Sequence, residues 1–78
     1  MDEHALRRAA KTLNDIFYID SAITLPLEEI VRAIRADGVI PSCEDLEDLA
    51  MGDDTGEVPQ ELREKYRHLD TLITLQFL

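Results

Sequence analysis

The sequence predicts an all-α fold, a small four-helix domain that spans residues 1–78 as a single unit. Apolar residues recur at intervals of three and four along most of the chain, which is the period of an amphipathic helix. Glycines and prolines separate these stretches, at positions where helices commonly begin and end. Hydrophobic residues make up 45% of the chain and charged residues 32%, so the composition is that of a globular protein and not of a disordered one.

The first helix is expected over about residues 3–18, with Asp2 as its N-terminal cap. One apolar stripe runs along it at helical spacing and consists of Leu6, Ala9, Ala10, Leu13, Ile16 and Phe17. Three basic residues on the opposite face, Arg7, Arg8 and Lys11, are interpreted as a solvated surface. Residues 18–23 interrupt the pattern and are expected to form a loop or a short extended segment.

The second helix is expected to follow Thr24 and Pro26 and to end at Gly38. A hydroxyl cap at Thr24 and a proline in the first turn both suit a helix start. The core side of this helix is expected to carry Leu27, Ile30, Val31 and Ile34. Gly38 is expected to adopt the left-handed conformation, because glycine has no Cβ to clash there.

The third helix is expected to be short and acidic, over about residues 43–51. Ser42 precedes it with an acid three residues later, which resembles a capping box. Its inward positions are Leu46, Leu49 and Ala50, and its outward positions are all carboxylates. Gly52 is expected to stop the helix, and residues 53–57 are expected to form an acidic loop.

The last helix is expected to start at Pro59 and to continue to about residue 76. Its stripe repeats at four-three-four-four spacing through Leu62, Tyr66, Leu69, Ile73 and Phe77. Residues 69–78 are also rich in β formers, so a strand is the alternative, but no convincing partner strand exists elsewhere. Apolar residues surround this tail, so it is expected either to be central to the core or to be covered by another chain. In the second case a homodimer interface is made by Leu69, Leu72, Ile73, Leu75, Phe77 and Leu78.

Negative charge is concentrated in one third of the chain. Nine acids and no lysine or arginine lie between Ala36 and Leu62, so the net charge of −9 resides there. Such a field attracts basic partners and repels polyanions. The carboxylates expected to bind a partner are Glu44, Asp45, Glu47, Asp48, Asp53, Asp54 and Glu57.

The leading hypothesis is therefore a small non-enzymatic inhibitor or regulator that docks on the basic groove of a nucleic-acid-binding protein, as a DNA mimic. Direct binding to nucleic acid is not expected. The second and third helices have the outline of a helix-turn-helix, yet the exposed positions of the reading helix would be carboxylates facing phosphates. The alternative is a structural adaptor or antitoxin-like subunit that binds through its apolar C-terminal helix. The acidic residues would then serve only to keep the chain soluble.

No motif points to an enzyme, a metal or a cofactor. The single cysteine, Cys43, has neither histidine, His4 or His68, near it in the sequence as a base. The acids around Gly56 lack the spacing of a calcium loop, and none of the three glycines belongs to a phosphate-binding loop. The N-terminus has no apolar segment typical of a signal peptide and residues 69–78 are too few to span a bilayer, so a cytoplasmic protein without membrane contact is expected.

Length, acidity and four expected helices resemble acyl carrier proteins, and residues 56–61 are similar to the segment that leads into their third helix. The resemblance implies a phosphopantetheine group on a serine within an Asp-Ser-Leu motif. Ser42 stands between Pro41 and Cys43, so this motif is interrupted on both sides. An acyl-carrier-like protein is accordingly the third alternative, and no cofactor is expected.

Overall fold

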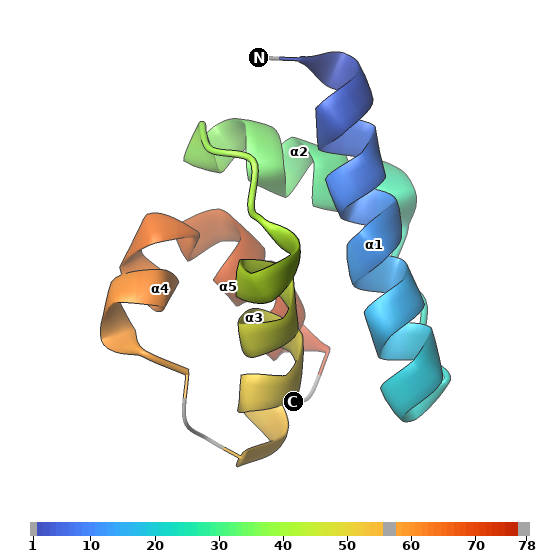
Figure 1. Cartoon of the computed structure of the whole chain (residues 1–78), viewed down its shortest axis with the longest axis vertical. Helices are drawn as coiled ribbons and strands as arrows, with labels where there is room; N and C mark the ends of the chain where they lie inside the picture. Colours follow the sequence, from blue (N-terminus) through green and yellow to red (C-terminus); the bar gives the residue numbers. More distant parts are fainter. Residues whose placement is uncertain (1, 56–57, 77–78) are drawn as a thin grey trace.

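The computed structural model describes residues 2–55 and 58–76, and for residues 20, 21 and 51–55 it describes the backbone alone. This part of the chain is all-helical, with no strand. In chain order the helices are α1 (Glu3–Ser21), α2 (Leu27–Asp37), α3 (Cys43–Thr55), α4 (Gln60–Lys65) and α5 (Arg67–Leu75) (Figure 1). The predicted all-α class is confirmed, and none of these helices is long and apolar enough to cross a membrane.

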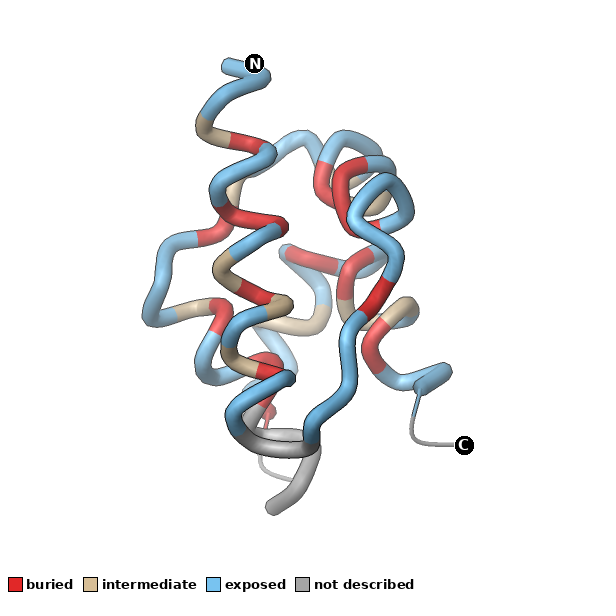
Figure 2. The backbone as a smooth tube through the Cα atoms, turned by 90° about the vertical axis from the view of Figure 1, so that its right-hand side faces the viewer, coloured by how far each residue is buried: buried red, intermediate tan, exposed pale blue. Residues whose placement is uncertain are grey.

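The helices enclose one apolar core. Helix α1 packs on α2 and α3, and α5 packs on the same two helices, while the short α4 contacts α3 and α5. Figure 2 shows that buried positions alternate with exposed ones along the helical turns. The accessible surface is 4972 Å², close to the roughly 4,800 Å² expected for a folded monomer of this mass. The chain therefore covers its core without help from a partner.

Helix α1 begins where the sequence predicts and ends later. Asp2 is the cap, because its carboxylate accepts a hydrogen bond of 3.0 Å from the backbone N–H of His4. The helix continues to Ser21 and ends at Ala22, which is left-handed with φ of 56° and donates its N–H to the carbonyl of Tyr18. The predicted end near residue 18 was wrong. Tyr18 and Ile19 are exposed, so the apolar stripe marks how far α1 is buried and not where its backbone hydrogen bonds stop.

The segment between α1 and α2 is held by a side chain of α1. Asn14 donates its amide to the carbonyl of Leu25 at 2.9 Å and accepts the N–H of Leu25 at 2.8 Å, which fixes Leu25 in the core. Helix α2 starts directly after Pro26 with no side-chain cap, so the predicted hydroxyl cap at Thr24 was wrong. Gly38 ends α2 at φ of 77°, as predicted. Because nothing lies within 4 Å of a Cβ built there, the backbone angle, and not space, requires glycine.

Helix α3 is longer than predicted. Ser42 caps it by accepting the N–H of Asp45 at 3.2 Å, and Gly52 lies inside the helix, which runs on to Thr55. The predicted stop at Gly52 and the predicted loop at residues 53–55 were therefore wrong; residues 56 and 57 lie outside the described part. A single glycine inside a helix costs only about 1 kcal/mol relative to alanine and does not end it.

The expected last helix is two helices. Tyr66 leaves the helical region, with φ of −115° and ψ of 47°, and separates α4 from α5. Pro59 immediately precedes α4, as predicted. The change of direction at Tyr66 lets Tyr66, Leu69 and Ile73 all reach the core, where each is at most 1% exposed. The strand alternative was wrong for Arg67–Leu75, which is helical, and residues 77 and 78 lie outside the described part.

Candidate functional site

The candidate site is the solvent side of α3. Glu44, Glu47 and Asp48 are exposed, while Leu46, Leu49 and Ala50 on the other side of α3 are buried. Residues three and four apart on a helix are neighbours, so these three carboxylates form one negative surface. Among the described residues, no ion pair includes any of them. We call Glu44, Glu47 and Asp48 the acidic face.

Asp45 belongs to the same helix but has a structural partner. It is half-buried and accepts a short hydrogen bond from the hydroxyl of Tyr66. Burial, and then the hydrogen bond and charge of Asp45, raise the pKa of Tyr66 above its ordinary range. Asp45 thus joins α3 to the break between α4 and α5, and its carboxylate is less open to a partner than those of the acidic face.

The raised pKa of Tyr66 predicts an alkaline loss of stability. The folded state favours the neutral hydroxyl, so the stabilisation is complete below about pH 10, the ordinary pKa of tyrosine, and is lost as pH rises towards the pKa in the folded state. Above pH 10, unfolding of the wild type should release about one more proton than unfolding of Tyr66→Phe. The free energy of unfolding, measured by denaturant titration, should therefore fall more steeply with pH for the wild type. Tyr18→Phe, which removes an exposed hydroxyl, should show the same dependence of the free energy of unfolding on pH as the wild type. The prediction would be contradicted if all three proteins had the same dependence on pH.

A second acid from the charge-rich third is also structural. Asp37 is the last residue of α2, and its side chain is only 2% exposed. It accepts the backbone N–H groups of His68 at 2.8 Å and of Leu69 at 3.1 Å, and the ring Nδ1 of His68 lies 2.9 Å from the same carboxylate. Asp37 of α2 therefore accepts hydrogen bonds from backbone N–H groups in the first turn of α5, which have no partner within their own helix. The sequence contained a signal for this, since an acid in the last turn of a helix opposes the helix dipole and needs another reason to be there.

The remaining predicted partner-binding residues are only partly placed. Asp53 and Asp54 lie in α3, but their side chains are outside the described part of the structure, as is the whole of Glu57. Helix α4, which packs on α3, adds two exposed acids that the predicted site did not include, Glu61 and Glu64. The acidic face is therefore the part of the predicted site whose side chains are both described and exposed.

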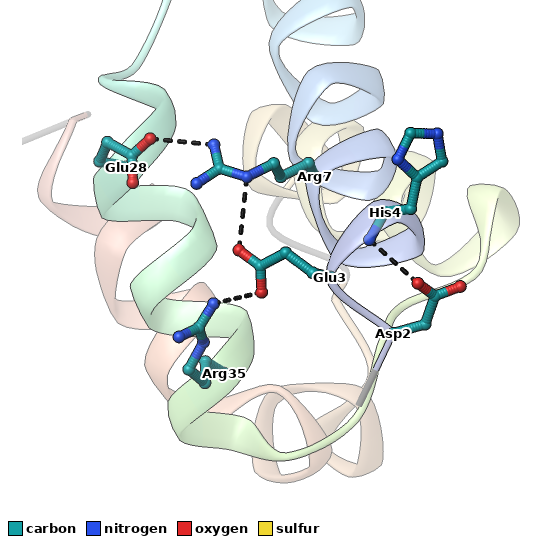
Figure 3. A network of polar contacts seen from close by, with 6 residues as sticks. All are labelled: Asp2, Glu3, His4, Arg7, Glu28 and Arg35. Atoms are coloured by element: carbon teal, nitrogen blue, oxygen red, sulfur yellow. Dashed lines mark hydrogen bonds and ion pairs between the residues drawn. The ribbon is translucent and has the colours of Figure 1, made fainter.

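Two basic residues, Arg7 of α1 and Arg35 of α2, are paired with acids. Arg7 of α1 contacts Glu3 at 3.3 Å and Glu28 of α2 at 3.0 Å, and Arg35 of α2 also binds Glu3 (Figure 3). The hydrogen bond and charge of Glu28 raise the pKa of Arg7. These pairs join α1 to α2 and cancel charge locally, whereas no ion pair of the described residues includes the acidic face.

The residues predicted to form an oligomer interface separate into two groups. Leu69 and Ile73 are fully buried in the core of the single chain. Leu75 is 58% exposed, and Leu72 is partly buried beside the core. Phe77 and Leu78 lie outside the described part. Only Leu72 and Leu75, among the described residues of this set, have surface that a second chain could cover.

Reactive side chains are not brought together in the described part of the chain. Cys43 is exposed at the start of α3 and lines a cavity against α1, whereas His68 lines a different one between α2 and α5. No three histidine, cysteine or acidic side chains form a cluster that could hold a metal ion within the described residues. His68 does have an orienting partner, Asp37, which the sequence did not reveal.

Ser42 is the residue that the resemblance to acyl carrier proteins would make an attachment site. It is exposed and immediately precedes α3, where its hydroxyl oxygen accepts the N–H of Asp45. This is the arrangement of a helix N-cap. Comparisons of the whole chain with protein-family models, with curated proteins and with solved structures found no match.

Proposed function

We propose that the protein is a non-enzymatic inhibitor or regulator that binds, through the acidic face of α3, the basic groove of a nucleic-acid-binding protein and so excludes DNA or RNA. The observation that carries the proposal is the exposure of Glu44, Glu47 and Asp48 without an ion-pair partner among the described residues. Charged surfaces normally mix both signs, and a stretch with nine acids and no basic residue departs from that pattern. A cytoplasmic location is part of the proposal.

The spacing of the acidic face supports mimicry of a phosphate backbone. At a rise of about 1.5 Å per residue, Glu44 and Asp48 are separated by roughly 6 Å along the axis of α3, with Glu47 between them. Three carboxylates over that length approach the density of one phosphate per about 3.4 Å in a single DNA strand. Arginine and lysine side chains form charge-assisted hydrogen bonds with carboxylates much as they do with phosphates. The same charges disfavour contact with nucleic acid itself.

Reversing charge on the acidic face should abolish partner binding. We expect Glu47→Lys with Asp48→Lys to weaken binding roughly 100-fold or more, because two attractive contacts become repulsive. The matched control is Asp15→Lys with Glu29→Lys, which changes the net charge equally at exposed positions on α1 and α2 and should retain most of the affinity. Circular dichroism and urea denaturation would verify that both double variants are folded.

The measurement is affinity capture from host lysate on the immobilised wild-type protein and on both variants, with elution first by duplex DNA and then by high salt. The proposal expects a nucleic-acid-binding protein that DNA releases from the wild type and the control, and that the reversed variant does not retain. The purified partner should then lose bound DNA when wild-type protein is added, in a mobility-shift titration. Equal retention by both variants, or release by neither DNA nor salt, would reject the acidic face as the binding surface.

A structural adaptor or antitoxin-like subunit is the second candidate, and the exposure of Leu75 favours it. In that case Leu75→Asp should abolish retention of the partner, while charge reversal on the acidic face should leave it intact. The two candidates thus give opposite results with the same pair of variants.

A further inference from the structure

An apolar groove of about 460 Å³ lies between α2 and α5. Its apolar lining consists of Ala33 and Ala36 of α2 and of Leu72 and Leu75 of α5. Leu75, at 58% exposed, projects the most apolar surface of these four to solvent. Leu69 and Ile73 of α5 face the core. The groove therefore lies on the solvent side of the contact between α2 and α5.

Two opposite charges also line the groove. Glu29 and Arg32 line the groove from α2, and both are exposed. Neither takes part in an ion pair among the described residues. Arg32 also lines a hollow on the α1 side of α2, where Glu28 and Arg35 are both engaged with residues of α1 (Figure 3). The groove therefore presents one acid and one base without partners beside an apolar surface.

We infer that this groove is the interface of a symmetric homodimer, in which Glu29 of each copy pairs with Arg32 of the other across the apolar contact. A two-fold interface places the same patch on both sides, so the patch must complement itself. An acid and a base three residues apart on one helix satisfy this condition when the two α2 helices run antiparallel. A partner with charge of a single sign would instead meet one like charge at this groove.

The distribution of charge permits such a dimer despite the net charge of −9. No described residue of α3 lines the groove, so this interface does not require the acidic faces of the two copies to meet. The surface area of the single chain is already that of a folded monomer. We therefore expect a reversible dimer with a dissociation constant in the range of roughly 1–100 µM, and not an obligate one.

Charge-reversal variants test the pairing directly. Sedimentation equilibrium of the purified protein at low salt, from low micromolar to near-millimolar concentration, should show a monomer–dimer equilibrium. Glu29→Arg and Arg32→Glu should each weaken dimerisation about 10-fold or more, since each places like charges opposite one another twice. An equimolar mixture of the two variants should form a heterodimer of restored affinity, and so should the double variant with itself.

The design separates specific pairing from general repulsion. Glu29→Arg lowers the magnitude of the net charge by two, so relief of repulsion alone would strengthen association, whereas the proposed pairing predicts weaker association. Leu75→Glu should abolish the dimer, and circular dichroism would establish that each variant is folded.

A protein that stays monomeric throughout, a dimer that survives Leu75→Glu, or variants that do not restore each other would overturn the inference. A helix of another protein occupying the groove would give the first of these results. The inference goes beyond the proposed function and can fail separately, because it uses the pure protein and residues outside the acidic face.

Discussion

Ile73→Ala is expected to lower the free energy of unfolding by about 2–5 kcal/mol, which approaches the whole stability of a domain this small. Ile73 is 0% exposed and lies in the core with Leu69, Tyr66 and the buried faces of α1, α2 and α3. The truncated side chain would leave a cavity among residues on several helices, and no other chain is needed to explain its burial. A large share of the variant should be unfolded in the absence of denaturant.

Leu75→Ala is the matched control on the same helix. Leu75 is 58% exposed, so its truncation should change the free energy of unfolding of the monomer by less than about 0.5 kcal/mol. Urea denaturation would compare the free energies of unfolding of the two variants, at a protein concentration too low for dimers to form. If both substitutions destabilised the protein equally, or neither did, the assignment of the inner and outer sides of α5 would be wrong.

The contrast between Ile73 and Leu75 also shows which buried positions the spacing of apolar residues predicts. The three-four spacing of Tyr66, Leu69 and Ile73 predicts burial, and all three are buried. The excess of apolar residues around that repeat does not by itself say whether a given leucine faces the core or a partner. Grouping Leu69 with Leu75 in one predicted interface combined an inner position with an outer one, and only the packing of α5 on α2 and α3 separates them.

Local signals predicted several helix boundaries correctly, and the others had more than one cause. Asp2, Ser42 and Gly38 act through hydrogen bonds within a few residues, so the sequence sufficed for them. The break at Tyr66 is different. Its hydroxyl bonds to Asp45, 21 residues earlier, and this contact has no local sequence signal. The prediction that Gly52 ends α3 was wrong for another reason, because propensity is a weak preference that the rest of a helix can override.

The acidic segment, which carries the proposed binding surface, contains two kinds of acid. Composition alone counts all nine equally. Asp37 and Asp45 hold helices together through hydrogen bonds, whereas Glu44, Glu47 and Asp48 have no described ion-pair partner. Burial distinguishes the two kinds, and burial of an acid at a helix end depends on which helix lies next to it in space.

Asp37→Ala should therefore destabilise the protein even though it removes a negative charge from an acidic chain. The carboxylate accepts two backbone N–H groups at the start of α5 and contacts the ring of His68. Without it these donors lose a charged acceptor in a largely covered position, where its side chain is 2% exposed. We expect a loss of about 2–3 kcal/mol in the free energy of unfolding, from a lost N-cap and hydrogen bonds to a charged group.

Asp48→Ala provides the control that separates this contact from net charge. It also removes one negative charge, but from an exposed position inside α3 with no ion-pair partner in the described structure. Less repulsion among the carboxylates of α3 and the higher helix propensity of alanine should raise the free energy of unfolding of Asp48→Ala by a few tenths of a kcal/mol. Urea denaturation of both variants at neutral pH should thus give shifts of opposite sign. Shifts of the same sign would mean that overall charge, and not the contact between α2 and α5, governs the effect of Asp37.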